Sequence, residues 1–289
     1  MPLIQPIIRP PAEADSFLLQ VTVGCSANDC TFCGAYMKKP FRIQDTSVII
    51  KDIEKGARRY PKTRKIFLLD GDALVLSNEK LIPILEKIIT AFPKLTRIAS
   101  YANGYNITSR SDKELQELYE HKLRLLYIGL ESGNQEILDR CKKKSTSDEM
   151  VMAVQRAAHS NIKSSVILLL GLGGRKFSKE HIRDSIIVLN RMQPRYLSFL
   201  SLMLIPGTPL YREAERGDFE ELNAHELLDE THAILEGLTL DKTIFRTNHA
   251  SNYFPLEGRL PYDKERLLLL LKTAREGNIP LKPDFFRGL

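Results

Sequence analysis

The sequence predicts an α/β protein built around a parallel sheet, and three observations carry this prediction. Apolar runs of strand length alternate six times with stretches of helical periodicity. The runs are nearly continuous in apolar residues, as expected of strands that are covered on both faces. Polar and glycine residues follow the end of every run. Because right-handed crossovers bring the carboxyl ends of parallel strands to one edge, we expect that edge to carry any ligand.

The predicted elements follow one another regularly. The first strand ends in a glycine turn, and each later strand is followed by a helix. The strands are expected at 17–23, 66–69, 96–101, 124–130, 163–170 and 195–204. The helices are expected at 46–60, 78–92, 111–122, 134–141, 147–160, 178–192, 221–238 and 262–277.

Three regions of the chain differ in composition. Residues 1–16 are proline-rich and predict an extended arm. Residues 17–210 contain the six βα units, although their pattern alone does not separate an open doubly wound sheet from a barrel. Residues 211–289 predict a mostly helical extension that covers the substrate, with a polar, aromatic and turn-rich stretch between its two long helices.

Charge and hydropathy bound the classes of protein to consider. No run of about 18 apolar residues is present, which excludes a predicted membrane span, and residues 1–16 lack a signal pattern, so we expect a cytoplasmic location. The net charge of +6 mildly favours an anionic partner such as tRNA or a polycarboxylate. The basic residues are dispersed, however, which is more typical of a solvated surface, so a nucleic-acid partner is the weaker alternative.

Three of the four cysteines lie close together on the loop after the first strand. Cys25, Cys30 and Cys33 are separated by four and then two residues. Three thiolates in a polar turn predict a metal centre with one open coordination position, which suits a site that does chemistry. A structural zinc is the alternative, but its fourth ligand would have to be the distant Cys141 or His249. We expect Cys141 to be a buried thiol, because an isolated cysteine mostly behaves as a small apolar residue.

This loop and several strand ends resemble the radical S-adenosylmethionine (radical SAM) superfamily. Phe32 directly precedes the last cysteine, as is usual there, although the first cysteine gap is one residue longer than the usual three. GLESG at 129–133 and LIPGTPL at 204–210 are similar to motifs of the branch with coproporphyrinogen dehydrogenases, methylthiotransferases and Elongator-type enzymes. NHASNY at 248–253 resembles a group of short members that share the longer gap. Six βα units match the family's partial (β/α)6 TIM-type barrel, and the resemblance selects it.

The resemblance implies two cofactors. A [4Fe–4S] cluster would be bound by Cys25, Cys30 and Cys33, and its fourth iron would chelate the amino and carboxylate groups of SAM. The strand ends would contact the rest of SAM. The implied SAM contacts are Phe32 beside the cluster, Asp70, Gly71 or Asp72 for the ammonium group, Glu131 for the ribose or sulfonium, Lys143 (or Arg140) for the carboxylate, Ser165 for the ribose, and Gly171 and Ile205 for the adenine.

Each implied contact has a structural alternative. Asp70 and Asp72 could form a strand-end turn or cap a helix, and Lys143 could belong to a solvated lysine run. Glu131 is less readily explained as a surface residue, because an acidic group at the buried end of a strand is costly unless it is paired. His249 would serve as a proton donor, a substrate ligand or an ordinary capping residue.

The resemblance also implies a reaction. One electron from a flavodoxin or ferredoxin would reduce the cluster, SAM would be cleaved to methionine and a 5′-deoxyadenosyl radical, and the radical would take hydrogen from a small or medium substrate. Tyr101 and His249 would face that substrate. The rival hypothesis is a non-catalytic carrier or chaperone that binds a cluster or haem. The identity of the substrate does not follow from the sequence.

Overall fold

The structure is a computed structural model that describes residues 3–288. The chain divides into two compact units. The first contains the chain up to Asp29, Ala35–Ile128 and Arg156–Ser164, and the second contains Cys30–Gly34, Gly129–Gln155 and the chain from Ser165 onward. Within the described residues, no helix combines the length and the apolar character needed to cross a bilayer.

The first unit contains four strands of a parallel sheet and a separate antiparallel pair. The sheet strands are β1 (Phe17–Gln20), β4 (Lys65–Leu69), β5 (Arg97–Tyr101) and most of β6 (Leu123–Glu131), and the pair is β2 (Thr22–Val23) with β3 (Arg42–Ile43). β1 pairs with β4, β4 with β5, and β5 with β6, all in parallel. Residues 66–69 of β4 are completely buried, which explains why this strand is a continuous apolar run.

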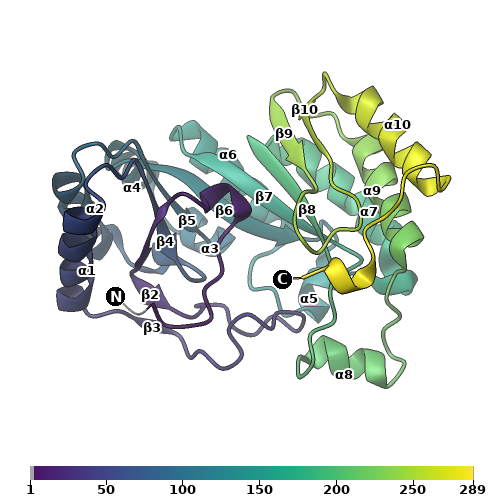
Figure 1. Ribbon diagram of the computed structural model, residues 1–289, viewed down its shortest axis with the longest axis horizontal. Helices are drawn as coiled ribbons and strands as arrows, with labels where there is room; N and C mark the ends of the chain where they lie inside the picture. The colour runs from purple at the N-terminus through teal and green to yellow at the C-terminus, as the bar shows by residue number, and fades with distance from the viewer. Residues whose placement is uncertain (1–2, 289) are drawn as a thin grey trace. The chain divides into compact units, whose positions relative to one another are not determined.

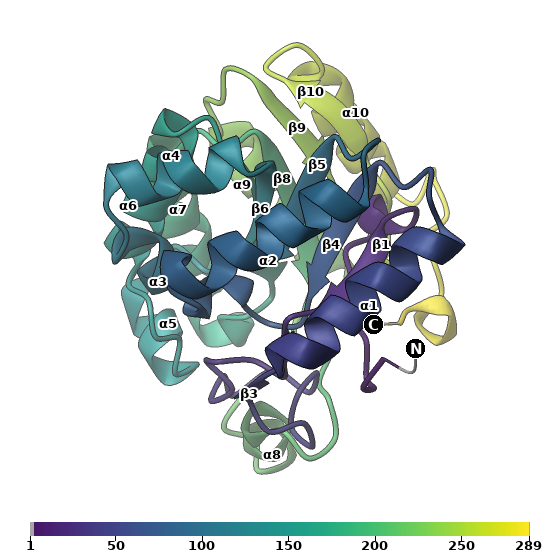
Figure 2. The same cartoon turned by 90° about the vertical axis from the view of Figure 1, so that its left-hand side faces the viewer.

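Amphipathic helices accompany these strands. They are α1 (Thr46–Arg59), α2 (Asn78–Ala91), α3 (Gly104–Thr108) and α4 (Asp112–Glu120), with the short 3-10 helices η1 (Pro11–Glu13) and η2 (Ala73–Val75). In Figure 2, α1 and α2 run in front of β1, β4 and β5. The buried residues Leu81, Leu85 and Ile88 recur every three or four positions, so one face of α2 faces the core.

A second group of strands continues the fold in the second unit. The strands are β7 (Lys163–Leu170), β8 (Tyr196–Ser201), β9 (Thr243–Arg246) and β10 (Glu257–Leu260). β8 pairs in parallel with both β7 and β9, whereas β10 pairs with β9 in antiparallel fashion. The principal sheet of the described residues contains eight strands, and its linear order has β1 and β10 at the two ends.

The α-helices of the second unit range from 6 residues in α5 (Gln135–Arg140) to 19 residues in α7 (Gly174–Met192). α7 and α9 (Ala224–Gly237) lie beside each other, and α9 also contacts α10 (Lys264–Arg275; Figure 1). The remaining elements are α6 (Ser147–His159, shared with the first unit), α8 (Pro209–Glu215) and η3 (Asp284–Phe286).

The predicted α/β class is confirmed, as is a partial rather than closed barrel. The differences from the predicted elements are local, and β3, α3 and α8 were not predicted. The first strand is split, because Val21 separates β1 from β2, and the sixth strand ends at Ser201 rather than at 204. The turn-rich stretch after α9 contains β9 and β10, which are only four residues long and therefore leave little periodicity to recognise.

Candidate cofactor-binding site

The cysteine loop begins in the first unit and continues into the second. Cys25 belongs to the first unit, whereas Cys30 and Cys33 belong to the second, and all three are half-buried. The amide of Cys33 donates to the carbonyl of Cys30 at 3.2 Å, so these two lie in one turn. Among residues 3–288, no three Cys, His, Asp or Glu side chains are arranged to hold a metal ion. Cluster binding by the three cysteines stays a prediction.

Asp70 stands directly after β4 and fastens the start of the cysteine loop. Its buried carboxylate accepts from the amide of Gly24 at 3.0 Å and from the side chain of Gln20 at 3.2 Å. Lys39, only 3% exposed, lies 2.8 Å away in an ion pair. Burial raises the pKa of Asp70, and the Lys39 ammonium opposes that rise. Its backbone has a left-handed φ of 69°, which turns the chain toward Cys25.

Gly71 lies against the first cysteine. A Cβ at this position would be 2.5 Å from both the Cβ and the Sγ of Cys25. Real atoms do not approach so closely, so only glycine lets the turn after β4 pack beside this thiol. The predicted importance of Gly71 therefore has a steric reason that is independent of any ligand.

Asp72 is completely buried and organises the next segment. Its Oδ1 accepts from the amide of Leu74 at 2.9 Å, which caps η2. Its Oδ2 accepts from the side chains of Asn103 at 2.9 Å and Asn106 at 2.5 Å. Burial raises the pKa of Asp72 to about 6. Every one of these bonds is internal to the chain, in agreement with the capping alternative.

Tyr101 ends β5 within an aromatic cluster. Its ring is 5.3 Å from that of Phe67, edge to face, and 5.9 Å from that of Tyr127. The Tyr127 hydroxyl donates to the buried carboxylate of Glu13 at 2.6 Å, and Arg97 donates to the same carboxylate at 2.6 Å. Burial and the Glu13 charge raise the pKa of Tyr127. The predicted N-terminal arm thus carries a residue that is fully buried.

Glu131 and Lys143 form an ion pair in the second unit. Their Oε1 and Nζ atoms are 3.0 Å apart, and the two side chains are 14% and 10% exposed. Glu131 has a left-handed φ of 65° at the end of β6. A Cβ on Gly129 would overlap Glu131 Oε1 and approach Lys143 Nζ to 3.2 Å. Gly129 is therefore a site residue that the sequence prediction left without a role, although it opens the GLESG motif.

Gly171 begins the turn after β7. Its φ is 79°, and its amide donates to the carboxylate of Glu230 at 2.5 Å. Ser165 lies earlier on β7, buried and in register with Tyr196 of β8. Glu230 is on α9, far along the sequence, and no motif predicted its place behind this turn.

The second part of the cysteine loop is seated on apolar side chains. The carbonyl of Cys141 accepts from the amide of Thr31 at 3.1 Å, and the carbonyl of Thr31 accepts from the amide of Leu210 at 3.0 Å. Phe32 packs on the cluster formed by Ile137, Cys141, Leu169, Leu172, Leu202 and Leu210. Cys141 is buried, as predicted, and burial raises the pKa of its thiol to about 12.

Ile205 and Arg140 flank this region. A Cβ on Gly34 would be 2.5 Å from Ile205 Cγ2, so the chain after Cys33 lies directly against Ile205. Arg140 is exposed, and its guanidinium lies 4.8 Å from the ring centre of Phe177. The two candidates for the SAM carboxylate thus differ, because Lys143 is nearly buried beside Glu131 and Arg140 is stacked on an aromatic ring.

His249 is half-buried and held by its neighbours. The amide of Ser251 donates to His249 Nδ1 at 3.1 Å, and the Ser251 hydroxyl lies 2.9 Å from the same nitrogen. Nδ1 is therefore an acceptor, which leaves the proton on Nε2. Burial, together with the nearby Lys282 charge, lowers the pKa of His249. Ser251 in turn accepts from the amide of Ser201 at 3.1 Å, which fixes the loop to the end of β8.

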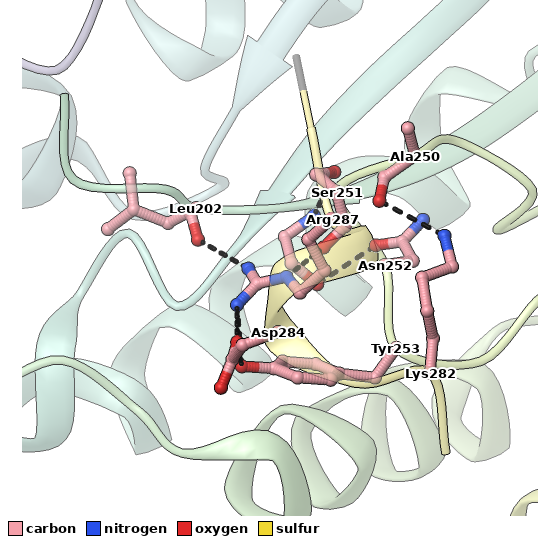
Figure 3. A network of polar contacts seen from close by, with 9 residues as sticks. Leu202, Ala250, Ser251, Asn252, Tyr253, Lys282, Asp284 and Arg287 are labelled. Carbon is pink, nitrogen blue, oxygen red and sulfur yellow. Dashed lines mark hydrogen bonds and ion pairs between the residues drawn. The ribbon is translucent and has the colours of Figure 1, made fainter.

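The C-terminal segment clamps this loop (Figure 3). Arg287 donates to the carbonyl of Ser251 at 2.7 Å and to that of Leu202 at 3.1 Å. It also binds the Tyr253 hydroxyl at 2.5 Å and the Asp284 carboxylate at 3.0 Å. Arg287 was not among the predicted residues, because a single arginine near the end of a chain carries no sequence pattern.

Comparisons with known proteins agree on one family. Residues 19–186 match the model of the Radical SAM superfamily. The chain is 25% identical over 120 residues to the tRNA uridine(34) acetyltransferase of Methanocaldococcus infernus, which covers 41% of this chain and 22% of the relative. It is 22% identical over 158 residues to the heme chaperone HemW of Bacillus subtilis, with coverages of 54% and 41%. The chain thus spans less than half the length of either curated relative.

A solved structure extends the likeness to the fold. Coproporphyrinogen III oxidase (HemN) of Escherichia coli, described as a radical SAM enzyme, matches with a TM-score of 0.56 and 13% identity. The match covers 76% of this chain and 52% of that chain. At this identity the likeness concerns the fold alone.

Proposed function

The chain belongs to the radical SAM superfamily, whose members bind a [4Fe–4S] cluster and SAM, and we propose that it is an enzyme that cleaves SAM reductively to act on a substrate. One observation carries this proposal. The stretch that matches the family contains all three clustered cysteines and the turns after β4, β5, β6 and β7. The acidic, glycine and lysine residues of those turns are therefore proposed to serve SAM.

The donor set fits the proposed cluster. Cys25, Cys30 and Cys33 are half-buried thiols on one short loop, and Gly71 leaves room for the first of them. When bound, the cluster would supply one electron to SAM, which would release methionine and a 5′-deoxyadenosyl radical able to abstract hydrogen. The task of the chain is to hold both groups and to keep water away.

The turn after β4 divides its work between backbone and side chains. Asp70 and Asp72 are fully buried and bonded within the chain, whereas Gly71 is half-buried. We therefore assign contact with the SAM ammonium to the backbone of Gly71, and we assign the shaping of the turn to the two carboxylates. This proposal differs from the sequence prediction, in which the carboxylate of Asp70 or Asp72 would itself accept from the ammonium.

The Glu131–Lys143 pair would serve the other polar groups of SAM. A carboxylate and an ammonium held 3.0 Å apart offer both signs of charge to a ligand that itself carries a carboxylate and a cationic sulfonium. Glu131 would meet the ribose or sulfonium side, and Lys143 the carboxylate. Ser165, Gly171 and Ile205, which all belong to the second unit, are proposed to contact the ribose and adenine, as the family resemblance implies.

Two residues would face the substrate. His249 carries its proton on Nε2, and its lowered pKa keeps the ring neutral near pH 7. A neutral ring of this tautomer donates one hydrogen bond, so we assign His249 as a substrate ligand rather than an acid. Tyr101 would line the substrate space from the end of β5. The electron would come from an external donor such as a flavodoxin or ferredoxin.

Product analysis tests the proposal directly. The anaerobic protein, reconstituted with iron and sulfide and reduced with dithionite in the presence of SAM, is expected to form 5′-deoxyadenosine and methionine. Mass spectrometry of the quenched mixture measures both. A protein with a full cluster that forms neither product would contradict the proposal, whereas the Cys30→Ala variant serves as the inactive control.

A non-catalytic carrier is the second candidate, and the similarity to the heme chaperone HemW over 54% of the chain is what favours it. The same experiment separates the two, because a carrier would bind its cargo without forming 5′-deoxyadenosine. Titration with haem, followed by visible absorbance, would then reveal binding with a defined stoichiometry.

A further inference from the structure

Three polar side chains are buried together in the second unit, and none has a part in the proposed chemistry. They are Ser132 at the end of β6, His181 on α7 and Glu230 on α9, with exposures of 0%, 0% and 1%. Ser132 Oγ is 2.8 Å from His181 Nδ1, and His181 Nε2 is 3.9 Å from Glu230 Oε2. Burying an imidazole and a carboxylate side by side is costly, so the arrangement calls for an explanation.

Backbone amides can only donate, so they fix the direction of the hydrogen bonds at the two ends of this group of contacts. The amide of Asn134 donates to Ser132 Oγ at 3.1 Å, so the Ser132 hydroxyl hydrogen is available for His181 Nδ1. We assign the His181 proton to Nε2, because that nitrogen faces the Glu230 carboxylate at 3.9 Å. At the far end, Glu230 Oε2 accepts from the amide of Gly171 at 2.5 Å, and Oε1 accepts from Ser178 at 2.9 Å.

The chain of contacts joins two turns that are distant in sequence. At one end Ser132 directly follows Glu131, and at the other end Glu230 holds the first amide of the turn after β7. α7 makes a second contact with the Glu131 turn, because Ser185 Oγ accepts from the amide of Gly133 at 2.9 Å. The contact between His181 Nε2 and Glu230 is the longest of the series, since Nε2 has no hydrogen-bond partner at normal distance.

A hydrolytic triad is excluded as the explanation. The same residue types form nucleophilic sites in hydrolases, but Ser132 is completely buried and its hydroxyl is committed to Asn134 and His181. No substrate reaches such a hydroxyl.

We propose that His181 is a positioning residue that couples the Glu131 turn to the Gly171 turn, so that the two turns are ordered together. The inference rests on the proposed function in one respect only: the coupling would serve to order the Glu131 turn and the Gly171 turn together for SAM binding. The coupling itself is a property of the chain and exists without SAM.

Backbone hydrogen exchange of the whole protein, followed by mass spectrometry in the absence of SAM, tests the coupling. We call the contacts Ser132–His181–Glu230 the relay. Ser132→Ala removes its end at the Glu131 turn and is expected to speed exchange about tenfold at the Gly171 turn, in peptides covering 168–175. Glu230→Gln keeps the size of the side chain, and we expect the reciprocal effect in peptides covering 130–136. The double variant should change exchange less than the sum of the single variants, because both cut the same path.

Thr243→Val is the matched control. The Thr243 hydroxyl is buried in the same unit and donates to the carbonyl of Pro194 at 2.6 Å, with no link to either turn. It is expected to lower the melting temperature as much as the relay variants while leaving exchange at both turns unchanged.

SAM affinity, measured by calorimetry with the cluster-loaded protein, completes the test. Ser132→Ala is expected to weaken SAM binding about tenfold with an unchanged cluster spectrum. Exchange that changes only next to each substituted residue would overturn the coupling. Coupled exchange in a protein that binds no SAM would instead leave the relay standing and contradict the proposed function.

Discussion

Gly129 shows how a missing side chain can shape a site. Because Gly129 has no side chain, the Glu131 carboxylate can occupy the space beside it and pair with Lys143. An added methyl group would overlap that carboxylate, so the ion pair could form only after Glu131 or the strand end moved. The glycine is thus required for the arrangement that we assign to SAM, even though it offers no functional group.

We predict that Gly129→Ala weakens SAM binding on the order of tenfold, about 1.4 kcal/mol, while the cluster absorbance is retained. Calorimetric titration of the reconstituted protein with SAM measures the affinity. Gly288→Ala is the control, because a Cβ there meets nothing within 4 Å. Unchanged affinity in Gly129→Ala would argue against a role of the pair in SAM binding.

Asp72 should make stability depend on pH. Burial raises its pKa in the folded protein to about 6, from the ordinary aspartate value of 3.8. Between about pH 4 and pH 6 the folded protein therefore binds more protons than the unfolded chain, and the stability from this group falls as the pH rises. The shift corresponds to a loss of about 3 kcal/mol across that window.

Asp72→Asn is expected to remove this dependence. The difference in unfolding free energy between Asp72→Asn and the original protein should shift in favour of the variant from pH 4 to pH 6 and then level off. Urea unfolding at a series of pH values measures it. A difference that stays constant over that range would show that Asp72 has an ordinary pKa.

At the scale of elements, the loop 248–253 depends on the segment that follows α10. Arg287 is 7% exposed and reaches backbone carbonyls on both the loop and the chain after β8. Its guanidinium also lies 4.1 Å from the ring centre of Tyr253. The loop that carries His249 is therefore ordered by contacts from a different segment rather than by its own sequence.

We expect Arg287→Ala to destabilise the protein by about 2 kcal/mol, because hydrogen bonds to a charged donor are lost at a nearly buried position. Hydrogen exchange at 248–253 should rise, and turnover of substrate should fall more than formation of 5′-deoxyadenosine without substrate. Arg266→Ala, at an exposed position, provides the comparison. Equal exchange at 248–253 in the two variants would show that the Arg287 contacts do not order this loop.

The elements that the sequence predicted well share strong local signals. The strand at β4 and the helix at α2 are continuous or periodic over their whole length, and both are found. β9 and β10 were missed because each is only four residues long, and β9 pairs with β8, which is distant in sequence. The short helix α3 was missed for a related reason, since the Asp72 side chain ties its first residues to another turn.

At the scale of the whole molecule, the proposed chemistry requires three cysteines to act together. Cys25→Ala, Cys30→Ala and Cys33→Ala should each abolish the brown absorbance of an iron–sulfur cluster, whereas Cys141→Ala should retain it. Burial raises the pKa of the Cys141 thiol to about 12, and its side chain belongs to an apolar cluster. Iron analysis and visible spectra after anaerobic reconstitution measure the outcome, and a retained cluster in Cys30→Ala would contradict the ligand assignment.

Much of the candidate site was predictable because its residues follow strands. Gly71, Glu131 and Gly171 stand at strand ends, where position along the chain already suggests position in space. Glu230 and Arg287 were not predictable, since Glu230 reaches the Gly171 turn from a helix, and Arg287 reaches the loop 248–253 from a segment distant in sequence. Their roles depend on tertiary packing, which no local pattern encodes.

The buried carboxylate of Glu13 bears on how shortened versions of the protein should be designed. A version that starts at residue 17 would remove the proline-rich stretch as if it were dispensable. It would also strip the counter-ion from Arg97 and leave the Tyr127 hydroxyl without its acceptor, deep in the first unit. Trimming should therefore stop before Pro11, where η1 begins.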